Sequence, residues 1–274
     1  MSKIRLGSVN YLNCRPLVHE LGGDADPVFS LRFDPPAECA SLLATGAIDL
    51  GLIPTIAYAD RPSDLVVPGV SIASEGPVAS VALFTRKPLS WIHTIALDTS
   101  SRTSVALTRI LCARRFGITP AFVRHAPDLE SMLAGHDAAL LIGDPALFAD
   151  HRALGAEKID LGQAWTEMTG LPFVWAFWAG RADSLPPHAV RRMQTAKEAG
   201  VLVSDALADA YMADRPQYKG IARHYLREHI LFDLSERMLQ GLQTYYREAA
   251  AVELITSAVE PRFFASASME RRRG

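Results

Sequence analysis

The chain has 274 residues, of which 49% are hydrophobic and 21% are charged, and its formal net charge at pH 7 is −2. This length is comfortable for two lobes, and the composition is that of an ordinary globular protein. Without a net basic charge the protein has no global field to attract nucleic acid or an anionic membrane, so we expect neither as a partner. No apolar run reaches the roughly 18 residues that would predict a membrane-spanning helix.

The cysteines and the ends of the sequence favour the cytoplasm. Cys14, Cys39 and Cys112 are odd in number and widely spaced, which is typical neither of a disulfide framework nor of a metal-binding pair. The first residues contain no apolar stretch long enough for a secretory signal. The basic tail at residues 271–274 is expected to be a solvated end.

Strand-like and helix-like segments alternate through the first two thirds of the sequence. Strands are predicted at 4–9, 47–53, 65–74, 78–85, 94–98, 121–125, 138–142 and 173–179. Helices are predicted at 16–21, 35–45, 103–116 and 128–134, with another that opens at Pro145. This alternation predicts a mainly parallel sheet with helices on both faces, which is an α/β fold.

After the last strand the pattern becomes purely helical, at 186–213, 219–229 and 235–259. Such a tail needs a sheet to cover, and the simplest arrangement returns it to the first lobe. We therefore expect lobe 1 to comprise 1–87 and 179–274, and lobe 2 to comprise 88–178. Two chain crossings, near 84–90 and 172–180, would form a hinge, and the ligand would bind in the cleft at the strand ends.

The usual catalytic signatures are absent from the sequence. It contains no phosphate-binding loop, no GxGxxG, no GxSxG and no HExxH pattern. The eight histidines are scattered, and His224 and His229 are five apart, which is the wrong spacing for one face of an α-helix. We therefore expect neither a metal nor a cofactor.

The most informative loop is residues 99–104, which holds five hydroxyl side chains and Arg102 between a predicted strand and a predicted helix. A helix N-terminus leaves N–H groups free and carries a partial positive charge. Hydroxyls add donors without adding charge, so the loop is suited to bind a carboxylate. The alternative is a simple helix cap, but one hydroxyl is enough for that role.

Two further strand-to-helix loops carry polar side chains. Asn13 lies in the loop from residue 9 to residue 16, where an amide offers both a donor and an acceptor. Asp144 stands at the start of the helix near Pro145. Each has a plainer interpretation as a turn or cap residue, and each is also placed to contact a ligand.

Six fragments, taken in order, resemble the chorismate dehydratase family of the futalosine route to menaquinone. They are VNYLNCRPL, IDLGLIPT, GPVASVALFT, DTSSRTSVALTRILC, LIGDPAL and DLGQAWTEMTGLPFVWAFW, and the resemblance runs from about residue 4 to about residue 180. The resemblance implies a periplasmic-binding-protein-like fold of type II, with two lobes, a cleft and two hinge strands. It also implies the removal of water from chorismate to give 3-[(1-carboxyvinyl)oxy]benzoate, without a cofactor.

Mapped onto this chain, the resemblance implies roles for individual residues. Asn13 is similar to the family's key polar active-site residue, and Ser80 resembles a pocket hydroxyl. Thr103 and Ser104 resemble a carboxylate clamp, Ser101 is expected to bind the substrate as well, and Asp144 is expected to face the same cleft. Arg15 and Arg102 are the candidate partners for a substrate carboxylate, although either could face solvent.

The identity of the base and of the substrate leaves alternatives open. No histidine or glutamate occurs in the cleft loops, so our hypothesis is that the enolpyruvyl carboxylate of the substrate removes the proton, with Asp144 as the alternative base. A binding protein for a small carboxylate would share the fold. A sibling enzyme that processes a cyclic dehypoxanthine futalosine would also share it, but its N-terminal pattern differs from YLNCRPL.

Overall fold

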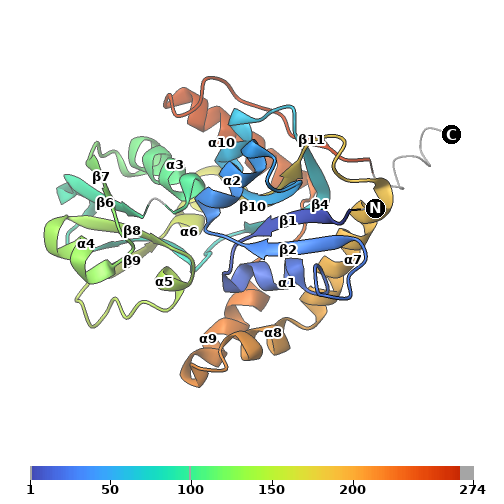
Figure 1. The fold of residues 1–274 in the computed structure, drawn as a ribbon. Coiled ribbons are helices and arrows are strands. Elements are labelled where there is room, and N and C mark those ends of the chain that lie inside the picture. Colours follow the sequence, from blue (N-terminus) through green and yellow to red (C-terminus); the bar gives the residue numbers. More distant parts are fainter. Residues whose placement is uncertain (1, 99, 266–274) are drawn as a thin grey trace. The chain divides into compact units, whose positions relative to one another are not determined.

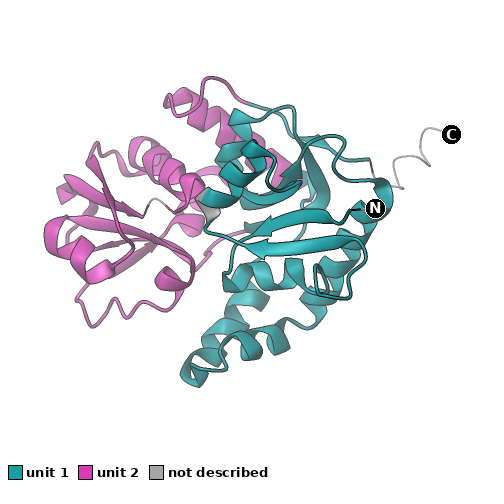
Figure 2. Cartoon of the chain, in the orientation of Figure 1, with its two compact units in different colours: residues 1–73, 174–236, 259–274 teal, residues 74–173, 237–258 magenta. Residues whose placement is uncertain are grey.

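The computed structural model describes residues 2–98 and 100–265, and its contacts divide the chain into two compact units. Unit 1 comprises residues 1–73, 174–236 and 259–274, and unit 2 comprises residues 74–173 and 237–258 (Figure 2). Thr99 and the basic tail at 271–274 lie outside the described residues.

The units differ from the expected lobes in three segments: 74–87 and 237–258 belong to unit 2, and 174–178 belongs to unit 1. The first segment contains β5 (Val81–Thr85), whose backbone pairs with two other strands of unit 2. The second contains most of α10 (Glu236–Ala251), which packs on unit 2. The chain therefore passes between units at four points, and only the passage after residue 173 lies where one was expected.

Unit 1 is built on a six-stranded sheet with the order β11-β4-β10-β3-β1-β2 (Figure 1). These strands are β1 (Ile4–Ser8), β2 (Phe29–Phe33), β3 (Leu50–Pro54), β4 (Leu65–Ser74), β10 (Phe173–Gly180) and β11 (Arg262–Phe263). β1 runs parallel to β2 and β3, whereas β10 runs antiparallel to β3. The sheet is therefore mixed rather than mainly parallel.

The helices of unit 1 are shorter than predicted. They are α1 (Arg15–Val18), α2 (Pro36–Thr45), α7 (Pro187–Leu202), α8 (Ser204–Tyr211) and α9 (Lys219–His224), with 3-10 turns η1 (Leu12–Cys14), η2 (Thr55–Asp60) and η5 (Pro216–Tyr218) and the π-helical turn η6 (Tyr225–His229). The helix predicted over 186–213 is broken at Val203, where the backbone leaves the helical region. α7 packs closely on α1, since a Cβ on Gly200 would lie 2.1 Å from the Pro16 carbonyl oxygen.

Unit 2 has a five-stranded sheet with the order β7-β6-β8-β5-β9. Its further strands are β6 (Thr94–Asp98), β7 (Ala121–His125), β8 (Ala138–Ile142) and β9 (Glu157–Asp160). Its helices are η3 (Leu89–Trp91), α3 (Arg102–Leu111), the π-helical turn η4 (Cys112–Phe116), α4 (Leu129–Gly135), α5 (Gly143–Leu147), α6 (Leu161–Thr169) and α10. β6 is parallel to β7 and β8, and β5 is antiparallel to β8 and β9.

α10 was expected on lobe 1, but its contacts place it on unit 2. Gly241 lets the helix approach the chain, because a Cβ there would lie 2.1 Å from the Pro172 carbonyl oxygen. The Tyr245 ring lies 4.9 Å from the Phe173 ring and 6.2 Å from the Trp165 ring, both centroid to centroid. An amphipathic helix shows in its sequence that it covers a sheet, but not which sheet it covers.

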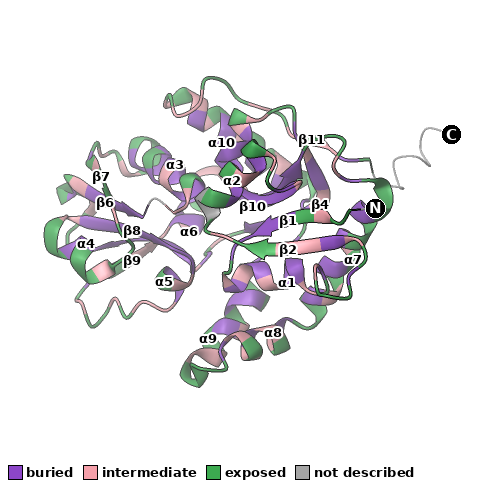
Figure 3. Cartoon of the chain, viewed as in Figure 1, coloured by how far each residue is buried: buried purple, intermediate pink, exposed green. Residues whose placement is uncertain are grey.

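The cores form along the central strands, which Figure 3 shows as largely buried. Every residue of β3, β5 and β8 is buried, which explains why these strands read as continuous apolar runs. In unit 2, Ala82, Phe84, Ala139 and Leu141 belong to one buried cluster. Among the described residues, no helix has the length and apolar character needed to cross a membrane.

Candidate active site

The topology of unit 2 brings three predicted segments to one edge of its sheet. β6 and β8 are parallel, so the loop after Asp98 and the helix that carries Asp144 begin at the same edge. β5 is antiparallel to β8, with Val81 opposite Ile142, so Ser80 also lies there. The hydroxyl loop, Ser80 and Asp144 therefore gather at the carboxyl ends of the parallel strands, where α/β sheets bind ligands.

The N-terminus of α3 is held by a small hydroxyl cluster. Ser101 is the N-cap: its Oγ accepts a hydrogen bond from the Ser104 N–H at 3.3 Å and lies 3.0 Å from the Ser104 Oγ. Thr103 and Ser104 are each 1% exposed. The Thr103 carbonyl accepts a hydrogen bond from the hydroxyl of Tyr245 at 3.1 Å. One hydroxyl thus performs the capping role, and α10 fixes the position of the helix start.

Ser100, in the same loop, was not among the predicted contact residues. Its N–H donates to a carboxylate oxygen of Asp98 at 2.9 Å. Its Oγ is buried and has no hydrogen-bond partner among the described residues. A buried hydroxyl without a partner is unusual in a folded protein and calls for an explanation such as a bound group. The burial of this serine could not be recognised from its position in the sequence.

Ser80 is 2% exposed, and two charged side chains form hydrogen bonds with the backbone just before it. The Asp160 carboxylate accepts from the N–H groups of Val78 and Ala79 at 3.0 and 2.7 Å. The Lys158 ammonium donates to the Ala79 carbonyl at 2.5 Å. Sequence reasoning missed both anchors. For Asp160 a signal existed, because it also caps α6 through the Gln163 N–H, the pattern of an acidic residue three positions before a glutamine.

Asp144 lies in the first turn of α5 and is half-buried. The N-cap of α5 is Ile142, whose side chain makes no capping hydrogen bond, so Asp144 does not occupy the cap position. The backbone turns sharply just before it, with Gly143 at φ +63°. A glycine allows this turn at little steric cost. Contact between Asp144 and a ligand stays a prediction.

In unit 1, Asn13 lies in η1, directly after the carboxyl end of β1. Its side chain is half-buried. Its Oδ1 is 3.3 Å from the Cys14 Sγ, and its amide nitrogen has no partner within the part of the chain that the structure describes. β3 is parallel to β1 and ends at the same edge, where the Thr55 hydroxyl donates to the Val174 carbonyl at 2.8 Å. Asn13 therefore offers an amide donor at this sheet edge.

Arg15 contacts its own loop and two aromatic rings from other elements, while its Nε is buried and has no hydrogen-bond partner among the described residues. Its guanidinium donates to the Asn10 side-chain oxygen. The guanidinium carbon lies 4.8 Å from the centroid of the Tyr211 ring and 5.4 Å from that of Phe33. The Tyr211 hydroxyl also donates to the Asn10 carbonyl at 2.9 Å. Arg15 thus braces the loop that carries Asn13 by cation–π contacts, and its binding to a substrate carboxylate stays a prediction. Arg102 is exposed on the first turn of α3.

Other reactive side chains do not form a metal or thiolate centre in the described residues. No group of three histidine, cysteine or acidic side chains could hold a metal ion there. Burial raises the pKa of the Cys39 and Cys112 thiols to about 12, which leaves both protonated. The spacing argument for His224 and His229 was wrong, because the π-helical turn η6 brings their rings within 5.0 Å.

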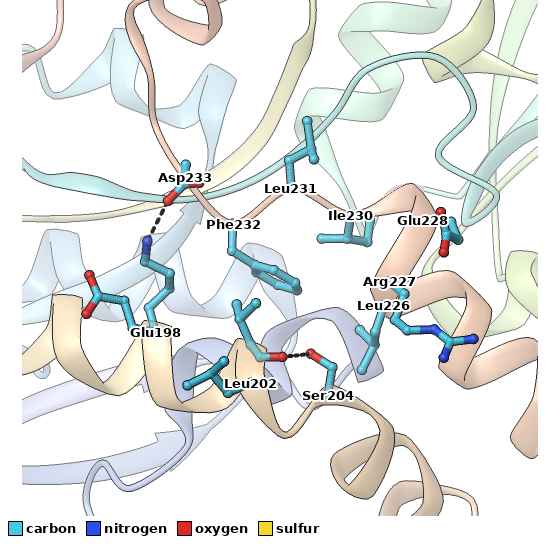
Figure 4. Close-up of a pocket in the computed structure, with 12 residues that line it drawn as sticks. Glu198, Leu202, Ser204, Leu226, Arg227, Glu228, Ile230, Leu231, Phe232 and Asp233 are labelled. Carbon is cyan, nitrogen blue, oxygen red and sulfur yellow. Dashed lines mark hydrogen bonds and ion pairs between the residues drawn. The ribbon is translucent and has the colours of Figure 1, made fainter.

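A pocket of about 810 Å³ in unit 1 lies apart from these residues (Figure 4). Its wall includes the apolar side chains of Leu226, Ile230 and Phe232 and the ion pair between Lys197 and Asp233, at 2.5 Å. None of the predicted site residues lines it. The pocket therefore plays no part in the candidate site.

Comparisons with known proteins agree with the resemblance seen in the motifs. The chorismate dehydratase of Thermus thermophilus is 33% identical over 238 residues, which are 81% of this chain and 86% of that protein. Two solved structures share the fold. A protein from Archaeoglobus fulgidus has a TM-score of 0.73, with 16% identity and 92% and 98% of the two chains covered. The periplasmic aliphatic sulphonate binding protein SsuA from Escherichia coli has a TM-score of 0.63, with 17% identity and 97% and 94% covered.

The fold is therefore the periplasmic-binding-protein-like α/β fold, as expected. A Candida albicans gene product described as exhibiting the generic periplasmic binding protein structural fold also matches, with a TM-score of 0.62 and 12% identity over 97% and 98% of the two chains. The sequence profile of a family described as menaquinone biosynthesis matches residues 4–251. The chain belongs to this menaquinone biosynthesis family.

Proposed function

We propose that this protein is a chorismate dehydratase, a hydro-lyase that converts chorismate into 3-[(1-carboxyvinyl)oxy]benzoate. The observation that carries this proposal is the 33% identity to a chorismate dehydratase over most of both chains. The protein acts on a small molecule, needs no cofactor and works in the cytoplasm. Its three cysteines form no disulfide bond in the described structure, as is usual in a reducing compartment.

The reaction breaks two bonds of the ring and makes one. The bond between carbon 3 and its hydrogen breaks, the hydroxyl leaves carbon 4, and a double bond forms between these carbons. The proton and the hydroxide leave as water, and the ring becomes aromatic, which supplies most of the driving force. Removal of the proton places negative charge on the conjugated ring carboxylate. A catalyst of this reaction must therefore stabilise a carboxylate whose charge increases in the transition state.

The N-terminus of α3 has the chemistry for that task. Ser101, Thr103 and Ser104 provide hydroxyls at a helix N-terminus, whose partial positive charge favours an anion, and Ser100 adds a buried Oγ without a described partner. Ser80 lies at the same edge of the sheet. These donors are neutral and held in place by other contacts, so they need little rearrangement as charge develops. In our proposal they bind the ring carboxylate.

For the base, we propose the enolpyruvyl carboxylate of the substrate itself. Asn13 would hold the substrate in the reactive geometry through its amide, without a proton changing hands. Orientation of this kind can contribute on the order of 7 kcal/mol to lowering a barrier. Asp144 is the alternative base, since it is half-buried at the sheet edge that carries the hydroxyls.

The proposal is tested by incubating the purified protein with chorismate and following the products by proton NMR and mass spectrometry. We expect a new aromatic product that is lighter than chorismate by one water. If chorismate binds but is not consumed, the protein is a carboxylate-binding protein. SsuA, which shares the fold, is likewise described as a binding protein. If only a cyclic dehypoxanthine futalosine is consumed, the protein is the sibling enzyme.

A further inference from the structure

Lys158 stands on β9, the edge strand of the unit 2 sheet, opposite Phe84 of β5. Its side chain is half-buried, and its ammonium lies 5.7 Å from the centroid of the Phe84 ring. It donates two hydrogen bonds to backbone carbonyls, to Ala79 at 2.5 Å and to Ala146 at 3.2 Å. The ammonium group of Lys158 therefore forms hydrogen bonds with backbone carbonyls in addition to any with solvent.

The two carbonyls belong to the two segments that carry proposed site residues. Ala79 directly precedes Ser80, and Ala146 lies in α5, two residues after Asp144. The strands next to these segments are paired, with Val81 after Ser80 opposite Ile142 before Asp144. One ammonium group therefore links the loop of Ser80 to the helix of Asp144.

The backbone that Lys158 holds is strained. Ala79 has φ +62°, a left-handed conformation that is sterically unfavourable for a residue with a side chain. Such a conformation persists only where neighbouring contacts enforce it. Here the Asp160 carboxylate holds the N–H of Ala79, and Lys158 holds its carbonyl. Burial also lowers the pKa of Lys158, which marks an environment in which an unpaired carbonyl would be costly.

We propose that Lys158 is a positioning residue of the dehydration, which fixes Ser80 and Asp144 relative to each other through the carbonyls of Ala79 and Ala146. The proposal rests on the proposed function, because it assigns Lys158 to the same site. Lys158 acts through the two segments and makes no contact with the substrate in this account. A displacement of Ser80 by a fraction of an ångström would then reduce the rate without removing any substrate-binding group.

The kinetic test uses Lys158→Met, which keeps an apolar stem of similar length and removes both donors. We expect kcat/KM for chorismate to fall on the order of 10- to 100-fold. The matched control is Arg86→Met, because Arg86 also donates to two backbone carbonyls of unit 2, those of Leu154 at 2.7 Å and Leu133 at 3.5 Å. This control variant should leave kcat/KM unchanged. Equal losses in the two variants would overturn the proposal.

A double-mutant cycle separates positioning from general destabilisation. If Lys158 acts through Ser80, then adding Lys158→Met to Ser80→Ala should cost much less than Lys158→Met costs in the wild type. A purely structural lysine would give losses that multiply, and that result would overturn the proposal. Lys158→Gln replaces the methionine variant in every measurement if the latter does not fold.

Amide hydrogen exchange, measured without substrate, keeps this inference separate from the proposed function. In Lys158→Met we expect faster exchange in two peptides, one that contains Ala79 and one that contains Phe148. The Phe148 N–H reports on α5 because it donates to the Asp144 carbonyl at 3.0 Å. Wild-type protein that ignores chorismate would overturn the proposed function alone. Unchanged exchange in either peptide would overturn the link made by Lys158, whatever the substrate proves to be.

Discussion

Neutral side chains dominate the candidate site at the scale of single residues. Asn13 offers an amide nitrogen without a described partner, and the start of α3 offers hydroxyls. Chorismate carries two carboxylates, so a site that adds negative charge would repel it. In our proposal these dipoles attract the substrate, and Arg15 braces the loop that carries Asn13.

Asn13→Asp tests this electrostatic requirement. The substitution preserves the size of the side chain but places a negative charge beside a dianion, so we expect KM for chorismate to rise and kcat to fall, each by on the order of tenfold or more. Steady-state kinetics gives both values. The matched control is Gln194→Glu, an amide-to-acid change in unit 1 where the amide donates to the Pro68 carbonyl at 2.8 Å, and it should leave both values unchanged.

Asp144→Asn distinguishes the two candidate bases. If the substrate's own carboxylate removes the proton, the variant should retain most of its turnover, because the amide still fills the position of the carboxylate. Turnover assays paired with calorimetric titration of chorismate measure activity and binding separately. A variant that binds chorismate normally but is nearly inactive would reject substrate assistance and assign the base to Asp144.

The lowered pKa of Asp137 leads us to expect that the stability of the fold depends on pH. The hydrogen bond from the Lys87 ammonium holds the pKa of this carboxyl well below its usual range, supported by the N–H groups of His93 and Thr94. A lowered pKa in the folded state stabilises the fold above the ordinary value of about 4 and loses that effect as the pH falls toward the folded value. Urea unfolding should therefore show Asp137→Asn less stable than wild type at neutral pH, with the difference shrinking in acid. A difference that stays constant would contradict this assignment.

At the scale of elements, the start of α3 combines two roles that one substitution can separate. Ser101→Ala removes the cap hydroxyl, so we expect the free energy of unfolding to fall by about 1 kcal/mol and KM for chorismate to rise. Asp128→Ala is the matched control, because Asp128 caps α4 through the Ser131 N–H at 2.7 Å. It should lose similar stability with KM unchanged. If KM is also unchanged in Ser101→Ala, then Ser101 is a cap and nothing more.

The sequence predicts some elements well because their signals are local. The strands at Thr94–Asp98, Ala121–His125 and Ala138–Ile142 match the prediction to the residue. β9 was missed because it is a short edge strand with the polar sequence EKID, which has no apolar run. α6 was missed with it, although Asp160 and Gln163 form a recognisable start signal. Long-range pairing, rather than local propensity, makes β9 a strand.

The candidate site could be predicted in part for the same reason. The loops that carry Asn13, Ser104 and Asp144 follow strands, and their hydroxyl, amide and acidic side chains are visible in the sequence. The anchors of these loops were not predictable, because they come from distant positions. Lys158 reaches Ala79 across 79 residues, and Tyr245 reaches Thr103 across 142.

At the scale of the whole molecule, the family resemblance predicted the fold. The boundaries of the two units, by contrast, differ from the expected lobe boundaries. The comparisons confirm the periplasmic-binding-protein-like fold and the menaquinone biosynthesis family. The expected lobe boundaries assumed one return of the chain, but the structure divides it at four points. α10 belongs to unit 2 because Gly241 and Tyr245 fit the surface formed by residues 165–173. Only three-dimensional packing reveals such a fit.

The most direct test of the account is the time course of chorismate with the purified wild-type protein in the presence of a metal chelator and without any added cofactor. We predict that each molecule of chorismate consumed yields one molecule of 3-[(1-carboxyvinyl)oxy]benzoate, at a rate proportional to the protein concentration. Chorismate that remains unchanged, or that is consumed only after a metal or cofactor is supplied, would contradict the account.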